Sequence, residues 1–236
     1  MFASLPMYHR AETASALDEI WVAIRDAVGG TGLDAPETLS QDQVGPDAWL
    51  RPDMVLSQTC GMPFRKKLHP HVALVGTLDH GVAGCPAGYY NSAIIKKRAC
   101  NLPDNPRPAI NDLQSQSGYA ALREVLPNPN NPIVSGAHLI SARMVAEGAA
   151  DIAAIDAVTW RLIEKYDAFS SQLEVLKFTK PTPALPLITG RYKSEVKTLA
   201  NAIARGLDQA PHSAKDMLGI KGLVHIHSST YLEVKP

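Results

Sequence analysis

Two serines and a glycine, Ser115, Ser117 and Gly118, stand at the start of a predicted helix, shortly after Asn111. The first four backbone N–H groups of a helix have no partner inside it, and the helix dipole adds partial positive charge there. Hydroxyls and free amides that converge in this way suit a phosphate, a phosphonate or a carboxylate, and a glycine lets the ligand approach the backbone. A serine before a helix is also an ordinary N-cap. The segment 115–119 therefore predicts an anion-binding site, with simple capping as the alternative.

Two further helix starts carry polar side chains. His138 closes the turn 135–138 (SGAH), where it could donate to an anion or simply cap the helix or lie at the surface. Asp156 follows an apolar run, so we expect it to cap the next helix, a role that leaves room for a ligand contact as well. Both residues enter the candidate site together with the segment 115–119.

Three polar residues follow the first predicted strands. Tyr8 comes directly after the strand at 2–5, and Gln58 and Thr59 follow the strand at 54–57. Open α/β folds bind ligands at the carboxyl ends of their strands. We therefore place these three side chains opposite the serine turn, across a predicted cleft.

Enzyme and metal motifs are missing from the sequence. It contains no G-x-S-x-G, H-E-x-x-H, P-loop or G-x-G-x-x-G pattern. Ser117 and His138 could be imagined as a nucleophile and its base, but nothing in the sequence indicates an acid to orient the histidine. His225 and His227 have the spacing of metal ligands on one face of a strand, yet no third ligand is indicated. We predict no catalytic residue, no metal and no cofactor.

Cysteine usage also argues against a metal or redox motif. The three cysteines, at positions 60, 85 and 100, form no C-x-x-C pair. Buried, inert thiols are the first interpretation, with a disulfide between Cys60 and Cys85 as the alternative.

Charge and hydropathy exclude two classes of partner. Lysine plus arginine and aspartate plus glutamate number 23 each, and the basic runs at 65–67 and 96–98 are short, so a nucleic acid is not the expected partner. No apolar run reaches the roughly 18 residues that a membrane span needs. The first eight residues lack the basic and apolar regions of a secretory signal, which leaves open a cytoplasmic protein or a removed leader.

The pattern along the chain is that of an α/β protein with mainly parallel sheets, because short apolar runs alternate with amphipathic helical stretches. Strands are predicted at 2–5, 54–57, 72–78, 92–96, 109–110, 133–135, 151–155 and 173–178. Helices are predicted at 15–28, with a capping box of Ser15 and Asp18, and at 119–126, 140–147, 156–166 and 194–207.

Two stretches mark crossings between lobes. Three glycines and a proline fall within 81–91, and the segment 181–186 holds three prolines. We therefore predict one discontinuous lobe of residues 1–88 plus 187–236 and a second lobe of residues 89–186. A cleft between two lobes is a common position for a ligand site.

Taken together, these residues resemble the periplasmic phosphate- and phosphonate-binding components of ABC transporters, which have the type II periplasmic-binding-protein fold. The resemblance covers nearly the whole chain. It rests on five segments: 54–61 (MVLSQTCG), 111–119 (NDLQSQSGY), 135–138 (SGAH), 145–160 (VAEGAADIAAIDAVTW) and 182–189 (TPALPLIT).

The resemblance implies two lobes that close on an oxyanion. It implies that Ser115 and Ser117 bind the oxyanion together with the backbone amides of Gly118 and Tyr119. It adds His138 and Tyr8 as further contacts to the oxyanion, and it places Asp156 beside a ligand substituent. Gln116 stands where phosphonate binders often have threonine, which removes one hydroxyl contact. It further implies a periplasmic location, which would make Cys60 and Cys85 better disulfide candidates, an ABC permease as partner, and a monomer.

The leading hypothesis is a solute-binding protein, not an enzyme, that captures a phosphonate, phosphate or phosphite between its lobes for uptake. One rival is a cytoplasmic enzyme of the same fold that acts on a small carboxylated or phosphorylated metabolite. The other is a ligand-sensing module that controls a partner protein. Fold alone does not decide among them.

Overall fold

The chain forms two compact units in a computed structural model that describes residues 1–234. Of the described residues, unit 1 comprises 1–89 together with 183–234, and unit 2 comprises 90–182. The chain leaves unit 1 through β4 (Tyr89–Tyr90) and returns through β10 (Thr182–Pro183), and these two short strands pair with each other. Unit 2 is therefore continuous in sequence, whereas unit 1 is assembled from both ends of the chain.

Unit 1 is built on a five-stranded sheet in the order β1-β2-β11-β3-β12. Its strands are β1 (Phe2–Ser4), β2 (Met54–Gln58), β3 (Ala73–Asp79), β11 (Pro186–Thr189) and β12 (Gly222–Val224). Its helices are α1 (Ala14–Gly29), α2 (Pro46–Trp49), α3 (Gly61–Pro63) with the π-helix η1 (Phe64–Leu68), α6 (Val196–Gln209), α7 (His212–Leu218) and α8 (Ser228–Leu232).

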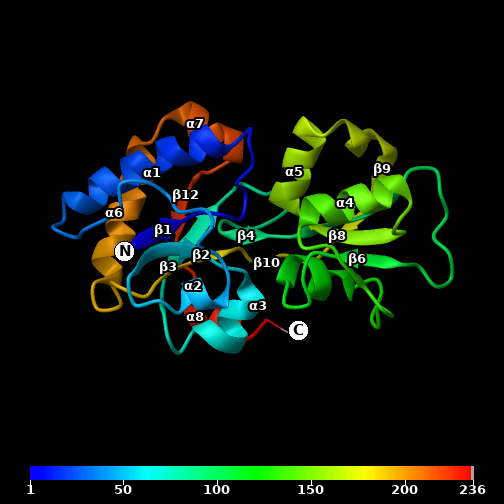
Figure 1. The fold of residues 1–236 in the computed structure, drawn as a ribbon, viewed down its shortest axis with the longest axis horizontal. Helices are drawn as coiled ribbons and strands as arrows, with labels where there is room; N and C mark the ends of the chain where they lie inside the picture. Colours follow the sequence, from blue (N-terminus) through cyan, green and yellow to red (C-terminus); the bar gives the residue numbers. More distant parts are fainter. Residues whose placement is uncertain (235–236) are drawn as a thin grey trace. The chain divides into compact units, whose positions relative to one another are not determined.

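Helices cover both faces of this sheet. Within unit 1, α1, α6 and α7 lie on one side, and α2, α3 and α8 lie on the other (Figure 1). The inward stripe of α1 repeats every three or four residues, as the sequence predicted, and includes the fully buried Ile20 and Trp21. Where α6 crosses α1, Gly206 brings the two backbones together, because a Cβ there would lie 2.5 Å from the Cα of Ile24.

Unit 2 has its own five-stranded sheet, in the order β7-β6-β8-β5-β9. Its strands are β5 (Ser92–Lys97), β6 (Pro108–Ile110), β7 (Ile133–Val134), β8 (Ile152–Asp156) and β9 (Leu173–Phe178). Its helices are the π-helix η2 (Gln116–Ala120), α4 (His138–Glu147), α5 (Ala157–Tyr166) and the 3-10 helix η3 (Ala168–Gln172).

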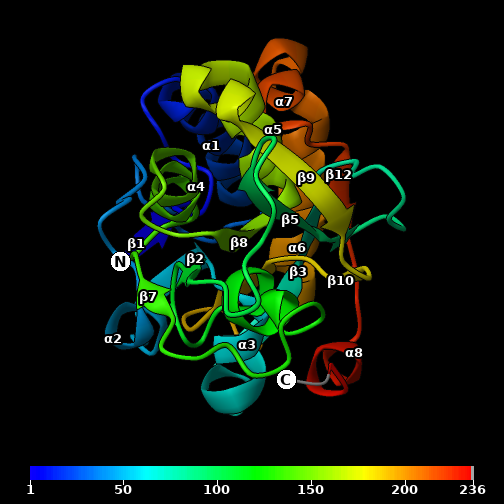
Figure 2. The same cartoon turned by 90° about the vertical axis from the view of Figure 1, so that its right-hand side faces the viewer.

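The core of unit 2 has two sides because side chains alternate across each strand. On β5, Ala93 and Ile95 pack with α4 and α5, whereas Ile94 between them packs against the helical turns that follow Ser115. Figure 2 shows α4 and α5 together on their side of this sheet. Every residue of β8 is buried, as expected of a central strand covered on both faces.

Both sheets are mixed, with most strands of each running in one direction and the others reversed. Within unit 2, β8 runs parallel to β6 but antiparallel to β5, and β5 is antiparallel to β9. Within unit 1, β11 is antiparallel to both β2 and β3, and β12 is antiparallel to β3. Strands β5 and β11 follow the crossings between units, so the crossing sets their direction and not a strand–helix–strand repeat. Strand β12, at the edge of the unit 1 sheet, is also reversed.

Several local predictions need correction. Helix α1 begins at Ala14 after Thr13, so Ser15 lies inside the helix and no capping box forms with Asp18. The helix expected over 119–126 starts three residues earlier, as a π-helical turn. His225 and His227 lie beyond the end of β12, and His227 caps α8. The cap by Asp156 and the end of α4 at Gly148, whose φ is 79°, are confirmed.

Membrane-spanning length is one property that none of these helices has. Across residues 1–234, no helix combines the length and the apolar composition that crossing a bilayer requires.

Candidate functional site

The serine turn of unit 2 follows the end of β6. Ser115 is the N-cap of η2, and its Oγ accepts a hydrogen bond of 2.9 Å from the backbone N–H of Gly118. The next turn closes when the N–H of Ala120 donates to the carbonyl of Ser115, five residues back. Ser115 therefore caps the turn, as the alternative interpretation held, and Ser117 and Gly118 are buried beside it.

Gly118 is required by the close approach of Asn111. A Cβ at position 118 would lie only 1.9 Å from the Oδ1 atom of Asn111 and 3.0 Å from the Oγ of Ser115. The Oδ1 atom of Asn111 is itself buried and accepts no hydrogen bond from any described residue. An amide oxygen without a donor thus lies against the serine turn.

His138 comes to the same place from the start of α4. Its Nε2 lies 2.9 Å from the Oγ of Ser117, so the two side chains are hydrogen-bonded. Two backbone bonds hold this second turn against the end of β6, from the N–H of Ser135 to the carbonyl of Ile110 and from the N–H of Gly136 to the carbonyl of Asn111. The sequence predicted both turns separately, and the structure joins them.

The imidazole of His138 is neutral at neutral pH. Burial lowers the pKa of His138 to about 4, against a smaller opposite influence from the backbone of Ala154. Within residues 1–234, no carboxylate hydrogen-bonds to His138. The pair with Ser117 therefore lacks the acidic partner that orients the histidine of a catalytic triad.

Asp156 ends β8 and caps α5. Its Oδ1 accepts hydrogen bonds of 2.8 and 3.0 Å from the backbone N–H groups of Val158 and Thr159. The carboxylate, only 2% exposed, therefore occupies the positive end of the helix dipole itself. An anionic ligand finds no free helix end at this position.

Gln116 and Tyr119 lie in η2 between and after the serines. Gln116 is buried within the turn. Tyr119 is partly buried and packs against the cluster around Ile110 and Leu122. The ring of Tyr119 thus has a role in the core of unit 2.

The unit 1 candidates follow strands β1 and β2, although Tyr8 lies in a turn four residues beyond the end of β1. Tyr8 packs edge-to-face on His80, with ring centroids 4.9 Å apart. Gln58 ends β2 and Thr59 follows it, and both are buried, with 2% and 0% of their surfaces exposed. No hydrogen bond from the side-chain amide of Gln58 is present among the described residues.

One buried polar residue of unit 2, Asn91, was missed in the sequence analysis. Asn91 lies just before β5, is 8% exposed, and has a buried Oδ1 without a hydrogen-bond partner in the described part of the chain. Its backbone carbonyl accepts from the N–H of Ala157, next to Asp156. Asn91 falls in a stretch rich in glycine, where an asparagine is usually a turn residue, so the sequence held no sharper signal.

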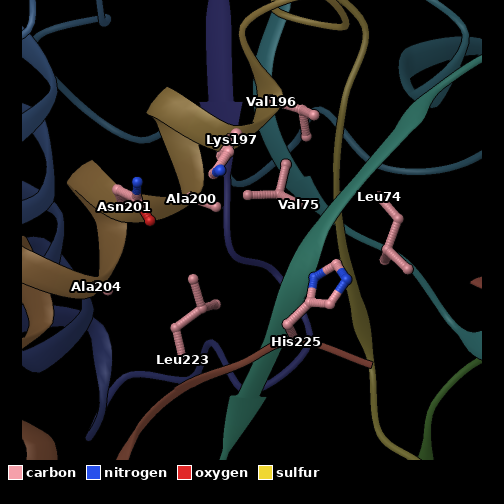
Figure 3. Close-up of a pocket in the computed structure, with 9 residues that line it drawn as sticks. All are labelled: Leu74, Val75, Val196, Lys197, Ala200, Asn201, Ala204, Leu223 and His225. Atoms are coloured by element: carbon pink, nitrogen blue, oxygen red, sulfur yellow. The ribbon is translucent and has the colours of Figure 1, made fainter. Parts of the chain in front are cut away.

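One pocket of unit 1 is lined by none of the candidate ligand-binding residues. It has a volume of about 470 Å³ and lies between α6 and the β3–β12 edge of the sheet (Figure 3). Apolar side chains form most of its wall, with polar groups at its rim: Leu74, Val75, Val196, Lys197, Ala200, Asn201, Ala204, Leu223 and His225. Its lining has no hydroxyl or amide cluster that would hold an oxyanion.

Metal-binding clusters and disulfides are not found in residues 1–234. No three His, Cys, Asp or Glu side chains come together in a way that could hold a metal ion. Cys60, Cys85 and Cys100 are free thiols, and Cys85, partly buried, has a raised pKa because burial penalises the thiolate.

Comparison with known proteins identifies the fold. No protein-family model and no curated protein sequence matches the chain. Among solved structures, PhnD1 from Prochlorococcus marinus MIT 9301, in complex with methylphosphonate, superposes with a TM-score of 0.72 at 15% identity, over 98% of this chain and 94% of that one. The chain has the type II periplasmic-binding-protein fold.

Two further structures show how widely this fold is used. The binding-protein component of an ABC phosphonate transporter from Pseudomonas aeruginosa has a TM-score of 0.67 at 15% identity, over 98% of this chain and 82% of its own. MatC from Rhodopseudomonas palustris, with bound malate, has a TM-score of 0.57 at 13% identity, over 93% and 89%. The α/β, two-lobed architecture is thereby confirmed, and at these identities the likeness extends to the fold alone.

Proposed function

We propose that the protein is a solute-binding protein for a small oxyanion, a phosphonate, phosphate or phosphite. The observation that carries the proposal is the convergence of Asn111, Ser117 and His138 at one place in unit 2. These residues come from the end of one strand, from the serine turn and from the start of another helix. The hydroxyl of Ser117, the ring N–H of His138 and the side-chain NH2 of Asn111 are neutral hydrogen-bond donors, and such donors suit an oxyanion.

The neutral state of His138 supports this role. A neutral imidazole carries one proton, and the hydroxyl of Ser117 carries another. When the imidazole proton is on Nε2, it is donated to the Oγ of Ser117, which leaves the hydroxyl proton for the anion. His138 then acts through Ser117, as a partner that sets the direction of its hydroxyl.

The same pair supplies the reason to prefer binding over catalysis. A serine nucleophile needs a base that gains a full proton, and burial opposes that charge on His138. No carboxylate in the described chain hydrogen-bonds to the ring to offset this cost. The enzyme hypothesis therefore ranks second.

The remaining parts of the proposal follow from the resemblance of the fold. We propose Tyr8, Gln58 and Thr59 as the ligand contacts from unit 1, and the backbone amides of Gly118 and Tyr119 as contacts from the serine turn. An ABC permease is the expected partner and the periplasm the expected location, because similar folds include the binding-protein component of an ABC phosphonate transporter.

A ligand screen tests the proposal directly. Thermal melts with phosphate, phosphite, methylphosphonate, sulfate and malate at 1 mM should identify at least one oxyanion that raises the melting temperature. A ligand with a Kd near 10 μM stabilises the native state by about 2.7 kcal/mol at that concentration. If none of these anions raises the melting temperature at millimolar concentration, the proposed function is wrong.

Substitution of Ser117 separates a binding role from a capping role. Ser117→Ala removes one hydroxyl donor, so the Kd for the oxyanion found in the screen should rise about 10- to 100-fold. Its melting temperature without ligand should fall only modestly, because Ser115 and not Ser117 caps the turn and the only hydrogen bond lost among the described residues is the one to His138. Ser15→Ala, on the exposed face of α1, is the matched control. A large loss of stability with unchanged affinity would make Ser117 a structural residue.

A further inference from the structure

Three polar residues lie at one edge of the unit 2 sheet. Strands β6 and β8 are parallel, so Asn111, which follows β6, and Asp156, which ends β8, lie at the same edge. Strand β5 is antiparallel to β8, with Ser92 paired to Asp156. Asn91, directly before β5, therefore lies at this edge too, on the other side of β8 from Asn111.

The backbone of Asn91 is hydrogen-bonded, but the oxygen of its side chain is not. The backbone carbonyl of Asn91 accepts from the N–H of Ala157 at 3.0 Å, and Ser92 beside it donates to the Oγ1 of Thr179 at 3.0 Å. The side chain is more than nine-tenths buried, yet its Oδ1 accepts no hydrogen bond from any described residue. Buried polar atoms in native proteins nearly always have a partner, so such an atom calls for one.

We propose that Asn91 is a ligand contact of this site, and that it selects an oxyanion whose substituent carries a hydroxyl group. The inference rests on the proposed function, since it extends the same site from the anionic head of the ligand to its substituent. Asn111, Ser117 and His138 hold the head, and Asn91 accepts a hydrogen bond from the other end.

The chemistry of the acceptor favours a hydroxyl over an ammonium group. A side-chain amide oxygen is neutral, so it pairs with a neutral donor without leaving a buried charge uncompensated. An ammonium would need a carboxylate to balance its charge, and the charge of Asp156, the neighbouring carboxylate, already lies at the positive end of the α5 dipole. A ligand with no donor at all would leave Asn91 buried and unpaired.

Strand spacing limits the length of the substituent. Asn111 and Asn91 belong to strands separated by two spacings, which is about 10 Å. The side chains of Asn111 and Asn91 extend from these strands, so the distance between their amide groups is shorter than the distance between the strands. A head held near Asn111 and Ser117 can therefore reach Asn91 with a substituent of two or three carbons.

The experiment compares matched phosphonates by titration calorimetry. Wild-type protein is titrated with ethylphosphonate, 2-hydroxyethylphosphonate, 3-hydroxypropylphosphonate and 2-aminoethylphosphonate. We expect one of the two hydroxylated ligands to bind at least about 10-fold more tightly than ethylphosphonate, because a site built to pair a hydroxyl rejects the analogue that lacks it. Equal affinity for ethylphosphonate and both hydroxylated ligands would overturn the inference.

Asn91→Leu assigns the preference to this residue. Leucine keeps the approximate size of the side chain and removes the acceptor, so the preference for the hydroxylated ligand should disappear while ethylphosphonate binds within about 3-fold of the wild-type Kd. Asn201→Leu, exposed on α6, is the matched control and should keep the preference. A preference that survives Asn91→Leu would overturn the inference.

Stability gives a second readout that a structural asparagine would not share. An unpartnered acceptor costs free energy, so Asn91→Leu should leave the melting temperature without ligand unchanged or raise it. A clear fall would make Asn91 a structural residue and overturn the inference. Should Asn91→Leu not fold, Asn91→Asp decides: it should shift preference from the hydroxylated ligand toward 2-aminoethylphosphonate, and an unchanged order of affinities overturns the inference.

Failure of the inference differs from failure of the proposed function. If the wild type binds none of the phosphonates, phosphate or phosphite, the proposed function is wrong and the inference falls with it. If the wild type binds these anions but ignores the hydroxyl group, only the role of Asn91 is wrong.

Discussion

Gly118 sets the distance between the serine turn and Asn111. Its missing side chain lets the Oδ1 of Asn111 lie against the turn, at a point that a Cβ would occupy. The contact depends on both residues, because it joins Asn111, at the end of β6, to a turn seven positions later in the sequence. The pair defines how wide the predicted anion site is.

Gly118→Ala should therefore displace Asn111 and weaken the site. The added methyl group would lie 1.9 Å from Oδ1, so the asparagine side chain or the turn must move, at a cost of about 1–3 kcal/mol in unfolding free energy. Denaturant unfolding measures this cost. Asn111→Ala removes the atom in conflict, so the double variant should recover much of the loss. Equal stability of the Gly118→Ala variant and the wild type would contradict this geometry.

His138 makes stability depend on pH in a defined window. Its pKa is about 4 in the folded protein and near its ordinary value of 6.5 in the unfolded chain, so the unfolded chain binds the proton first as pH falls. The stabilisation is fully present above pH 6.5 and declines between pH 6.5 and 4. The slope due to this one residue is about 1.4 kcal/mol per pH unit at most.

Unfolding free energies at several pH values check this prediction. His138→Gln should remove that part of the slope, whereas His212→Gln, exposed at the start of α7, should leave it. If both variants and the wild type lose stability in parallel between pH 6.5 and 4, His138 does not carry the effect.

At the scale of elements, the packing of α6 on α1 depends on Gly206. A Cβ at this position would lie 2.5 Å from the Cα of Ile24 and 2.8 Å from the carbonyl of Ala23. Those are backbone atoms, which cannot move aside as a flexible side chain can. The two helices must separate if position 206 carries a side chain.

Gly206→Ala should thus destabilise the protein although alanine is the better helix former. Alanine gains about 1 kcal/mol in helix propensity, and overpacking between the helices costs about 1–3 kcal/mol or more, so the net change is a loss. Gly29→Ala, near the end of α1 with nothing within 4 Å of the added methyl group, is the control and should be neutral or stabilising. A Gly206→Ala variant as stable as the Gly29→Ala variant would contradict the close crossing.

Local pattern was enough to predict most elements but not how they pair. Apolar runs placed β2, β5, β8 and β9 within a residue or two, because a buried strand is recognisable from its own side chains. The antiparallel direction of β5 and β11 depends on where the chain crosses between units, which no local window contains. The π-helical start of η2 likewise depends on the bond from Ala120 back to Ser115.

The candidate site shows the same limit. Ser115, Ser117, Gly118 and His138 were singled out because each stands at a predicted helix start, where local sequence is informative. Asn91 was missed because its importance comes from the pairing of Ser92 with Asp156 across two strands. A residue whose role is set by strand register cannot be identified before the register is known.

At the scale of the whole molecule, unit 1 depends on a strand from the far end of the chain. Strand β11 lies in the middle of its sheet, between β2 and β3. Residues 1–89 alone therefore supply β1, β2 and β3 but not the strand that joins them. Unit 2 needs no such contribution, because its two core clusters lie within residues 90–182.

A chain that ends after residue 182 should keep unit 2 and lose unit 1. Without β11, strands β2 and β3 have no common partner, and their apolar faces stay exposed to water. Hydrogen exchange should show slow amides in β5 and β8 at nearly wild-type protection and fast exchange throughout residues 1–89. Protected amides in β2 and β3 of the truncated chain would show that β11 is dispensable.

The central place of β11 also bears on the order in which the protein takes shape during synthesis. A ribosome makes the chain from its first residue, so residues 1–89 emerge early but must wait for positions 186–189 before their sheet can close. Unit 2, encoded in the middle, is complete sooner and can fold while the first part of the chain is still open. Residues 1–89 are thus made before unit 2 but become native after it, and until then they are exposed to chaperones and proteases.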